Sequence, residues 1–88
     1  MTSVLNTPLP GDLVIRPLMD ETGLRRRIVF VLTVWPHMET MGGPYQSYGY
    51  ARRQAAVAAD KRQVQIWREY SINGERPQLE NVTESDGV

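Results

Sequence analysis

The most hydrophobic segment of the chain spans residues 25–35 and is rich in β-branched and aromatic side chains, which favour strands. It stops at Pro36, because proline cannot donate a hydrogen bond to a sheet ladder. Successive side chains of a strand point to opposite faces, so the apolar part divides into two sets. The first set is Ile28, Phe30, Leu32 and Val34, and the second is Val29, Val31, Thr33 and Trp35. Apart from Thr33, both faces are apolar.

A strand that is apolar on both faces is normally covered on both. The chain offers one clear helix, which covers one face. Trp67 also lies on the polar side of its own predicted strand, and burying a large aromatic side chain is worth roughly 2–3 kcal/mol. The second cover is then another copy of the chain, the N-terminal segment or a different protein. The candidate partner interface is Val29, Val31, Trp35 and Trp67.

Residues 13–19 form a second apolar segment, which contains Pro17. The proline predicts an edge strand or an irregular extended segment. Residues 20–23 read as a turn, so this segment and strand 25–35 could pair as a hairpin.

Residues 64–72 alternate in a way that predicts another strand. Asn73-Gly74 follows as a two-residue turn signal, and a short last strand is expected over residues 76–79.

Residues 37–44 predict a loop centred on two glycines and a proline. A helix is expected to begin near Tyr48, because Ser47 can accept a hydrogen bond from a first-turn N–H. Four alanines then fall on one helical face, at Ala51, Ala55, Ala58 and Ala59. Such a face allows the helix to lie close to the sheet that it covers.

These elements predict an α+β fold with a small antiparallel sheet of three to four strands and one Ala-faced helix packed on one side. A chain of 88 residues fits a single domain. We expect the domain to span residues 13–79. A flexible N-terminal arm, residues 1–12, would precede it, and a disordered acidic tail, residues 80–88, would follow.

Part of this pattern resembles a known type of small domain. The residues concerned are Tyr45-Gln46-Ser47, the helix alanines Ala51 and Ala55, the apolar strand at residues 64–67 and the turn at Asn73-Gly74. They resemble the DUF2188-type small bacterial β–α–β domains of unknown function, in which an aromatic residue precedes a Ser or Thr cap. The resemblance implies an Ala-rich helix on a small sheet and assigns no functional residue.

Ten basic and ten acidic side chains give a formal net charge of zero, so charge alone attracts neither nucleic acid nor an anionic membrane. The absence of cysteine excludes a disulfide framework and a thiolate zinc site, and it predicts a cytoplasmic protein. The longest apolar stretch is too short to span a bilayer, so no membrane association is expected.

His37 is the only histidine, and with Glu39 it matches the beginning of a zinc-deaminase pattern. The paired cysteines that complete such a site are missing. Ser47 is better explained as a helix cap than as a nucleophile. We therefore predict no catalytic residue, no metal site and no cofactor, and a protein that is not an enzyme.

The sequence predicts a non-enzymatic protein-interaction module that self-associates as a homodimer or binds another protein. The alternative is a nucleic-acid-binding accessory protein. Its candidate surface at the helix start is Tyr48, Tyr50, Arg52 and Arg53. Aromatic rings provide stacking platforms for bases, and arginines contact phosphates.

Overall fold

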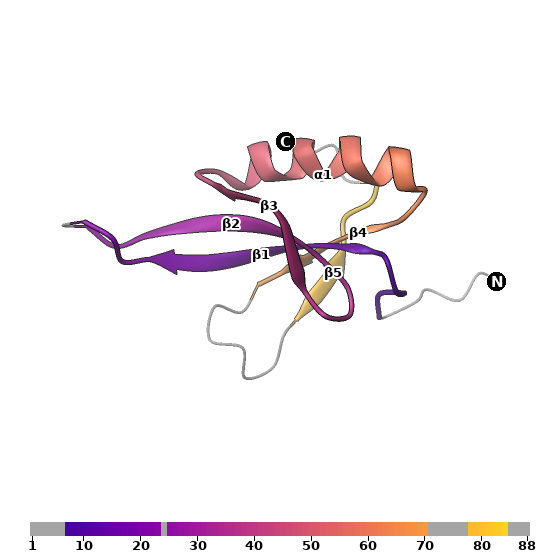
Figure 1. Cartoon of the computed structure of the whole chain (residues 1–88), viewed down its shortest axis with the longest axis horizontal. Coiled ribbons are helices and arrows are strands. Elements are labelled where there is room, and N and C mark those ends of the chain that lie inside the picture. The colour runs from indigo at the N-terminus through magenta and orange to yellow at the C-terminus, as the bar shows by residue number, and fades with distance from the viewer. Residues whose placement is uncertain (1–6, 24, 71–77, 85–88) are drawn as a thin grey trace.

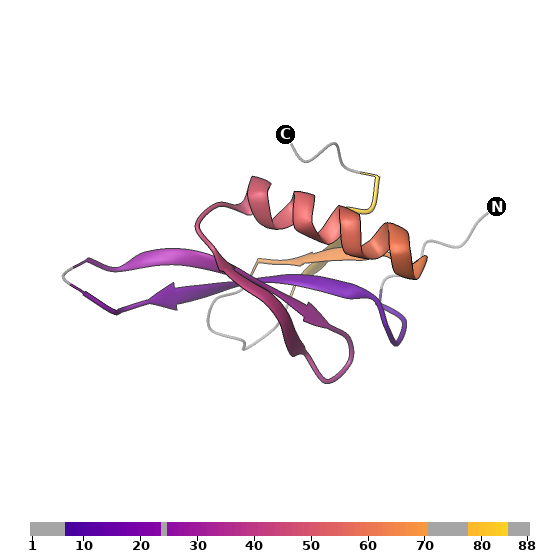
Figure 2. The same ribbon diagram turned by 45° about the horizontal axis from the view of Figure 1, so that its top comes forward.

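The computed structural model describes residues 7–23, 25–70 and 78–84. Its strands are β1 (Leu13–Asp20), β2 (Arg27–Val34), β3 (Glu39–Tyr45), β4 (Ile66–Glu69) and β5 (Leu79–Asn81), and its helix is α1 (Tyr48–Arg62). The strands form one sheet in the order β3-β2-β1-β4-β5, and α1 lies across one side of it (Figures 1 and 2). The α+β prediction is confirmed.

The prediction of three to four antiparallel strands is wrong, because the sheet has five strands and is mixed. Strand β4 runs parallel to β1, while the other neighbouring pairs are antiparallel. The helix explains the parallel pair. It carries the chain from edge strand β3 across the sheet to the far side of β1, and a crossover of this kind joins parallel strands.

Pro17 lies in the second half of β1. The first half of this strand, residues 13–15, lies between β2 and β4, whereas the second half pairs with β2 alone among the described strands. Pairing between β1 and β4 ends at Ile15, opposite Arg68. The N–H of Leu13 donates to the carbonyl oxygen of Gln65 at 2.9 Å, and strand N–H groups alternate in direction, so position 17 also faces the β4 side. Within the described residues, the missing N–H of Pro17 therefore falls on an unpaired edge and removes no hydrogen bond from the ladder.

Strand β3 occupies the segment that was predicted to be a loop, so that prediction is wrong. The strand pairs with β2 through irregular register shifts between Phe30 and Thr33. Gly43 has a φ of +100°, and a Cβ at this position would lie 2.8 Å from the carbonyl oxygen of Phe30. Glycine is required at position 43 because the backbone of β2 lies too close for a side chain. The loop prediction failed because bulged edge strands and turns both contain glycine.

The predicted helix is confirmed. The Ser47 hydroxyl oxygen accepts a hydrogen bond from the N–H of Tyr50 at 3.2 Å. The alanine face is packed on the sheet, with Ala51, Ala55 and Ala59 buried and Ala58 half-buried. The core cluster beneath it is Leu13, Ile15, Leu32, Ile66 and Val82.

The two ends of the predicted domain differ from the structure. Asp12, placed at the end of the arm, is buried, while residues 1–6 lie outside the described residues. Strand β5 extends past residue 79, and Val82 is buried with its N–H donating to the carbonyl oxygen of Ile66 at 2.8 Å. Residues 80–84, assigned to the tail, therefore belong to the folded part. The Asn73-Gly74 turn and residues 85–88 lie outside the described residues.

Candidate interaction surfaces

The predicted partner interface lies on the sheet face opposite α1, and most of it is already covered. Val29 and Val31 are each 7% exposed in the single chain, and Trp67 is 2% exposed. Trp35 is half-buried, and its backbone pairs with Gly11 and Asp12. These residues lie on a common side, but the side is not an open apolar surface.

Asp12 explains how the chain accommodates Trp67. One carboxylate oxygen of Asp12 accepts from the indole N–H of Trp67 at 3.1 Å and from the N–H of Leu9 at 2.9 Å. The other accepts from the N–H of Gln65 at 3.1 Å. The buried carboxylate is thus satisfied by three donors, as a buried polar group requires. An intramolecular cover was one of the open alternatives, and for Trp67 it comes from Asp12, whereas residues 13–19 belong to the sheet itself.

An ion pair closes the same face beside β4. The Nε of Arg16 donates to a carboxylate oxygen of Glu69 at 2.5 Å, and the Glu69 side chain is almost completely buried. A buried carboxylate without a partner would be strongly destabilising, so this arginine keeps the charge in place. The pair links β1 to the end of β4, immediately beyond the last residue at which the two strands pair.

An open apolar surface lies elsewhere, on the far part of the β1–β2 hairpin. We call residues 18–20 and 27–29 the ribbon, because within the described chain they pair only with each other. Figure 1 shows this end of the hairpin extending well beyond α1 and the other strands. Leu18, Met19 and Ile28 are 42%, 41% and 43% exposed. Met19 and Ile28 are directly opposite each other, on the face that carries α1.

Charged side chains surround the ribbon tip. Arg27 lies 3.5 Å from Asp20, and Arg26 lies 3.9 Å from Glu21. Hydrogen bonds from the side chain and the backbone N–H of Thr22 lower the pKa of Asp20, with a further contribution from Arg27. Exposed pairs of this kind contribute little to stability. The acidic groups lie at the end of β1, and the arginines lie at the start of β2.

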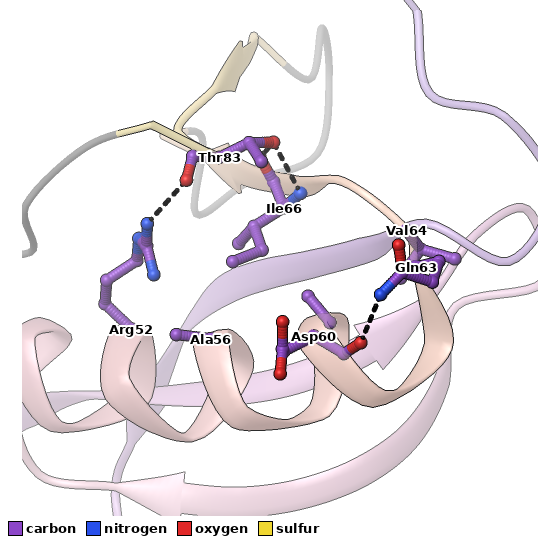
Figure 3. Close-up of a pocket in the computed structure, with 8 residues that line it drawn as sticks. Arg52, Ala56, Asp60, Gln63, Val64, Ile66 and Thr83 are labelled. Atoms are coloured by element: carbon purple, nitrogen blue, oxygen red, sulfur yellow. Dashed lines mark hydrogen bonds between the residues drawn. The ribbon is translucent and has the colours of Figure 1, made fainter.

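The predicted nucleic-acid surface does not form one surface. Arg52 is buried, and its guanidinium donates to the carbonyl oxygens of Val82 at 2.9 Å and Thr83 at 3.0 Å. Figure 3 shows this side chain reaching from α1 toward the segment after β5. Arg52 therefore fastens that segment to the helix, whereas the neighbouring Arg53 is exposed.

The two tyrosines of the predicted surface also differ. Tyr48 packs edge-on against Phe30, with ring centroids 5.9 Å apart, and burial raises the pKa of its hydroxyl. Tyr50 is exposed, and its ring centroid lies 5.4 Å from that of Tyr45. The second pair lines an open pocket of about 390 Å³ together with Pro44, Gln46 and Ser47.

The structure also reveals a stacked arginine that the sequence analysis missed. The guanidinium carbon of Arg68 lies 3.8 Å from the ring centroid of Tyr48 and 4.5 Å from that of Tyr70. We call these three residues the Arg68 clamp. The one available signal was the strand alternation, which places a charged residue between Ile66 and Tyr70 on the helix-facing side.

A pocket of about 250 Å³ lies between α1 and β4, lined by Arg52, Asp60, Gln63 and Thr83 among others (Figure 3). The Gln63 amide donates to the carbonyl oxygen of Asp60, and the Thr83 hydroxyl accepts from the N–H of Ile66. These polar groups of the pocket are therefore used in hydrogen bonds within the protein. Among the described residues, no three His, Cys, Asp or Glu side chains gather as metal ligands, and His37 is exposed.

No protein-family model matches this chain, and comparisons with curated proteins and with solved structures find no significant match. The resemblance to DUF2188-type domains stays a prediction. Of the residues that the structure describes, none belongs to a helix with the length and hydrophobicity of a membrane span.

Proposed function

We propose that this protein is a non-enzymatic interaction module that self-associates through the ribbon. The observation that carries the proposal is the exposure of Leu18, Met19 and Ile28 on a hairpin that projects from the rest of the fold. Exposed apolar groups gathered on one projection mark association surfaces more often than scattered ones do. The proposal keeps the predicted self-association and moves its site from the covered face to the ribbon. We also keep the cytoplasm, expected from the cysteine-free composition, as the compartment.

Side-chain packing is the mode of association that the ribbon supports. The N–H positions of residues 17 and 19 face the unpaired side of β1, and Pro17 lacks the first of these donors, which opposes pairing with a strand from another molecule. The free β2 edge is only three residues long. Face-to-face packing of Met19 and Ile28 is therefore favoured over a shared sheet.

The expected dimer is weak. Leu18, Met19 and Ile28 are already partly buried in the single chain. Burying the exposed part of one such side chain in an interface is therefore worth about 1 kcal/mol. The lost freedom of the two molecules costs at least about 4 kcal/mol, which offsets most of that gain. A formal net charge of zero means that two copies do not repel each other at long range. We expect a dimer whose population rises with concentration.

Sedimentation velocity over a wide concentration range tests the proposal. Wild type should shift toward twice the monomer mass, and Met19→Lys should remain monomeric, because two lysines would meet at the interface. Val57→Lys is the matched control, since Val57 is 57% exposed on α1, away from the ribbon. A monomeric wild type at every concentration, or equal weakening by both variants, would contradict the proposal.

Single-stranded nucleic acid is a second candidate partner, supported by the exposed Tyr50 beside Tyr45 and by the exposed Arg53. Adjacent aromatic rings and an arginine suit base stacking and phosphate contact. Fluorescence anisotropy of a labelled oligonucleotide should then show salt-sensitive binding that Tyr50→Ala abolishes. Absence of binding at low salt would exclude this function.

A further inference from the structure

We propose that the Arg68 clamp is a carboxylate-binding site, and that its ligand is Glu21 at the ribbon tip of a second copy of this chain. The inference rests on the proposed self-association and names the polar contact that would orient it. Three features support it: the stacked guanidinium, the pocket beside it and the arrangement of charge along the ribbon.

Arg68 is held in a fixed position with its donors available. The rings of Tyr48 and Tyr70 stack on its guanidinium, and Tyr70 is fixed in turn by its hydroxyl, which donates to Glu80 at 2.9 Å. Within the described part of the chain, no carboxylate forms an ion pair with Arg68. Stacking occupies the faces of a guanidinium and leaves the N–H groups at its edge, which match a carboxylate.

A pocket of about 140 Å³ adjoins the clamp at the base of the ribbon. Pro17, Ile28 and Phe30 line it on one side, and Arg68, Glu69 and Tyr70 line it on the other. Pro17, Ile28, Phe30 and Arg68 share the sheet face on which Met19 and Ile28 are exposed. Apolar walls reduce the effective dielectric constant, so an ion pair formed inside such a pocket is stronger than one in open water.

The order of the strands decides which limb of a second ribbon would reach this pocket. If two ribbons stack face to face in opposite directions, β1 lies over β1 and β2 lies over β2. The clamp is on the β1 side, because β4 is the neighbour of β1. The limb that carries Asp20 and Glu21 therefore approaches the clamp. Stacking in the same direction would instead place the two α1 helices, which lie on this face at the base of the hairpin, against each other.

The spacing along the strand selects Glu21. A strand rises roughly 3.3 Å per residue. With the two-fold axis at the Met19–Ile28 pair, Glu21 is two residues toward the tip and Pro17 is two residues toward the base, so one lies above the other. Among the described residues, Glu21 forms one exposed ion pair, with Arg26 at 3.9 Å, and this weak contact can be replaced by one with Arg68. Asp20 instead accepts two hydrogen bonds from Thr22.

A charge-swap experiment tests the pair by sedimentation velocity, near the concentration at which half of the wild type is dimeric. Glu21→Arg and Arg68→Glu should each weaken the dimer about tenfold, and the double variant should recover most of the loss. Arg53→Glu is the control for a change of charge on an exposed arginine elsewhere. Arg68→Gln should weaken the dimer without being rescued by Glu21→Arg, and circular dichroism verifies that each variant is folded.

The outcomes separate this inference from the function on which it rests. If wild type dimerises and Met19→Lys abolishes the dimer, while Glu21→Arg and Arg68→Glu leave the dimer constant unchanged, the ribbon is the interface and the Glu21–Arg68 contact is refuted. The contact is also refuted if the double variant dimerises as weakly as the sum of the two single losses predicts. If wild type does not dimerise at all, the proposed function itself fails.

Discussion

The region around Trp67 and the ribbon both carry large apolar side chains, yet the chain covers the first and leaves Leu18, Met19 and Ile28 of the second partly exposed. Trp67 lies between β1 and β5 in the sheet, and Asp12 accepts a hydrogen bond from its indole N–H. Met19 and Ile28 lie where β3 and β4 no longer accompany the hairpin, and about two fifths of each remains exposed. Apolar content alone therefore does not locate an interface. The number of neighbouring elements that reach a residue decides whether its surface stays available.

The largest expected effect comes from removing the tryptophan of the covered region. Trp67→Ala should lower the free energy of unfolding by about 3–5 kcal/mol, because it leaves a cavity and takes a donor from the buried Asp12. Leu18→Ala in the ribbon should cost less than about 1 kcal/mol. Urea unfolding followed by circular dichroism measures both. Similar losses for the two variants would remove the distinction between the regions.

A smaller loss is expected where the segment after β5 is fastened to the helix. Arg52→Met keeps the aliphatic part of the side chain but leaves the carbonyl oxygens of Val82 and Thr83 without these donors. The unfolding free energy should fall by about 1–3 kcal/mol. Arg53→Met, one residue along and exposed, should change it by less than about 0.5 kcal/mol. An equal response at both positions would contradict a structural role for Arg52.

The folded monomer should tolerate a charge in the ribbon. Met19→Lys should change the unfolding free energy by less than about 0.5 kcal/mol when it is measured below the concentration of dimer formation. The same variant should abolish the dimer, so stability and association would separate. A loss of several kcal/mol would mean that the ribbon belongs to the packed core.

The smallest effect concerns the acid sensitivity of the ribbon tip. The pKa of Asp20 lies below its ordinary value of 3.8, chiefly because Thr22 donates hydrogen bonds to the carboxylate. A lowered pKa adds stability that is fully present above pH 3.8 and is lost as the pH falls through the folded pKa. An NMR titration should show the Asp20 pKa rising toward 3.8 in Thr22→Val. An unchanged pKa would show that the Thr22 hydroxyl is not its cause, because the variant keeps the backbone N–H of residue 22.

The elements that the sequence predicted well are those with a strong local pattern. The alternation in residues 28–35 and the alanine spacing after Ser47 correspond to β2 and α1. Residues 39–44 were mistaken for a loop because glycine and proline serve both turns and bulged edge strands, and only the approach of Gly43 to β2 separates the two.

The candidate surfaces depended on contacts between distant parts of the chain, which local patterns do not contain. Asp12 and Trp67 are separated by 55 positions, so the cover over the tryptophan could not be foreseen. Arg52 was expected on the surface because helix periodicity does not show that the segment after β5 crosses it. The exposure of Met19 likewise depends on where β4 ends, at Glu69.

Cysteine cross-linking tests the ribbon interface most directly, because the natural chain contains no cysteine. In the antiparallel arrangement residue 19 lies beside its own copy, so Met19→Cys should form a disulfide-linked dimer under mild oxidation. Val57→Cys, at a more exposed position on α1, should remain largely monomeric at the same concentration. Equal cross-linking of the two variants, or none in Met19→Cys, would contradict self-association through the ribbon.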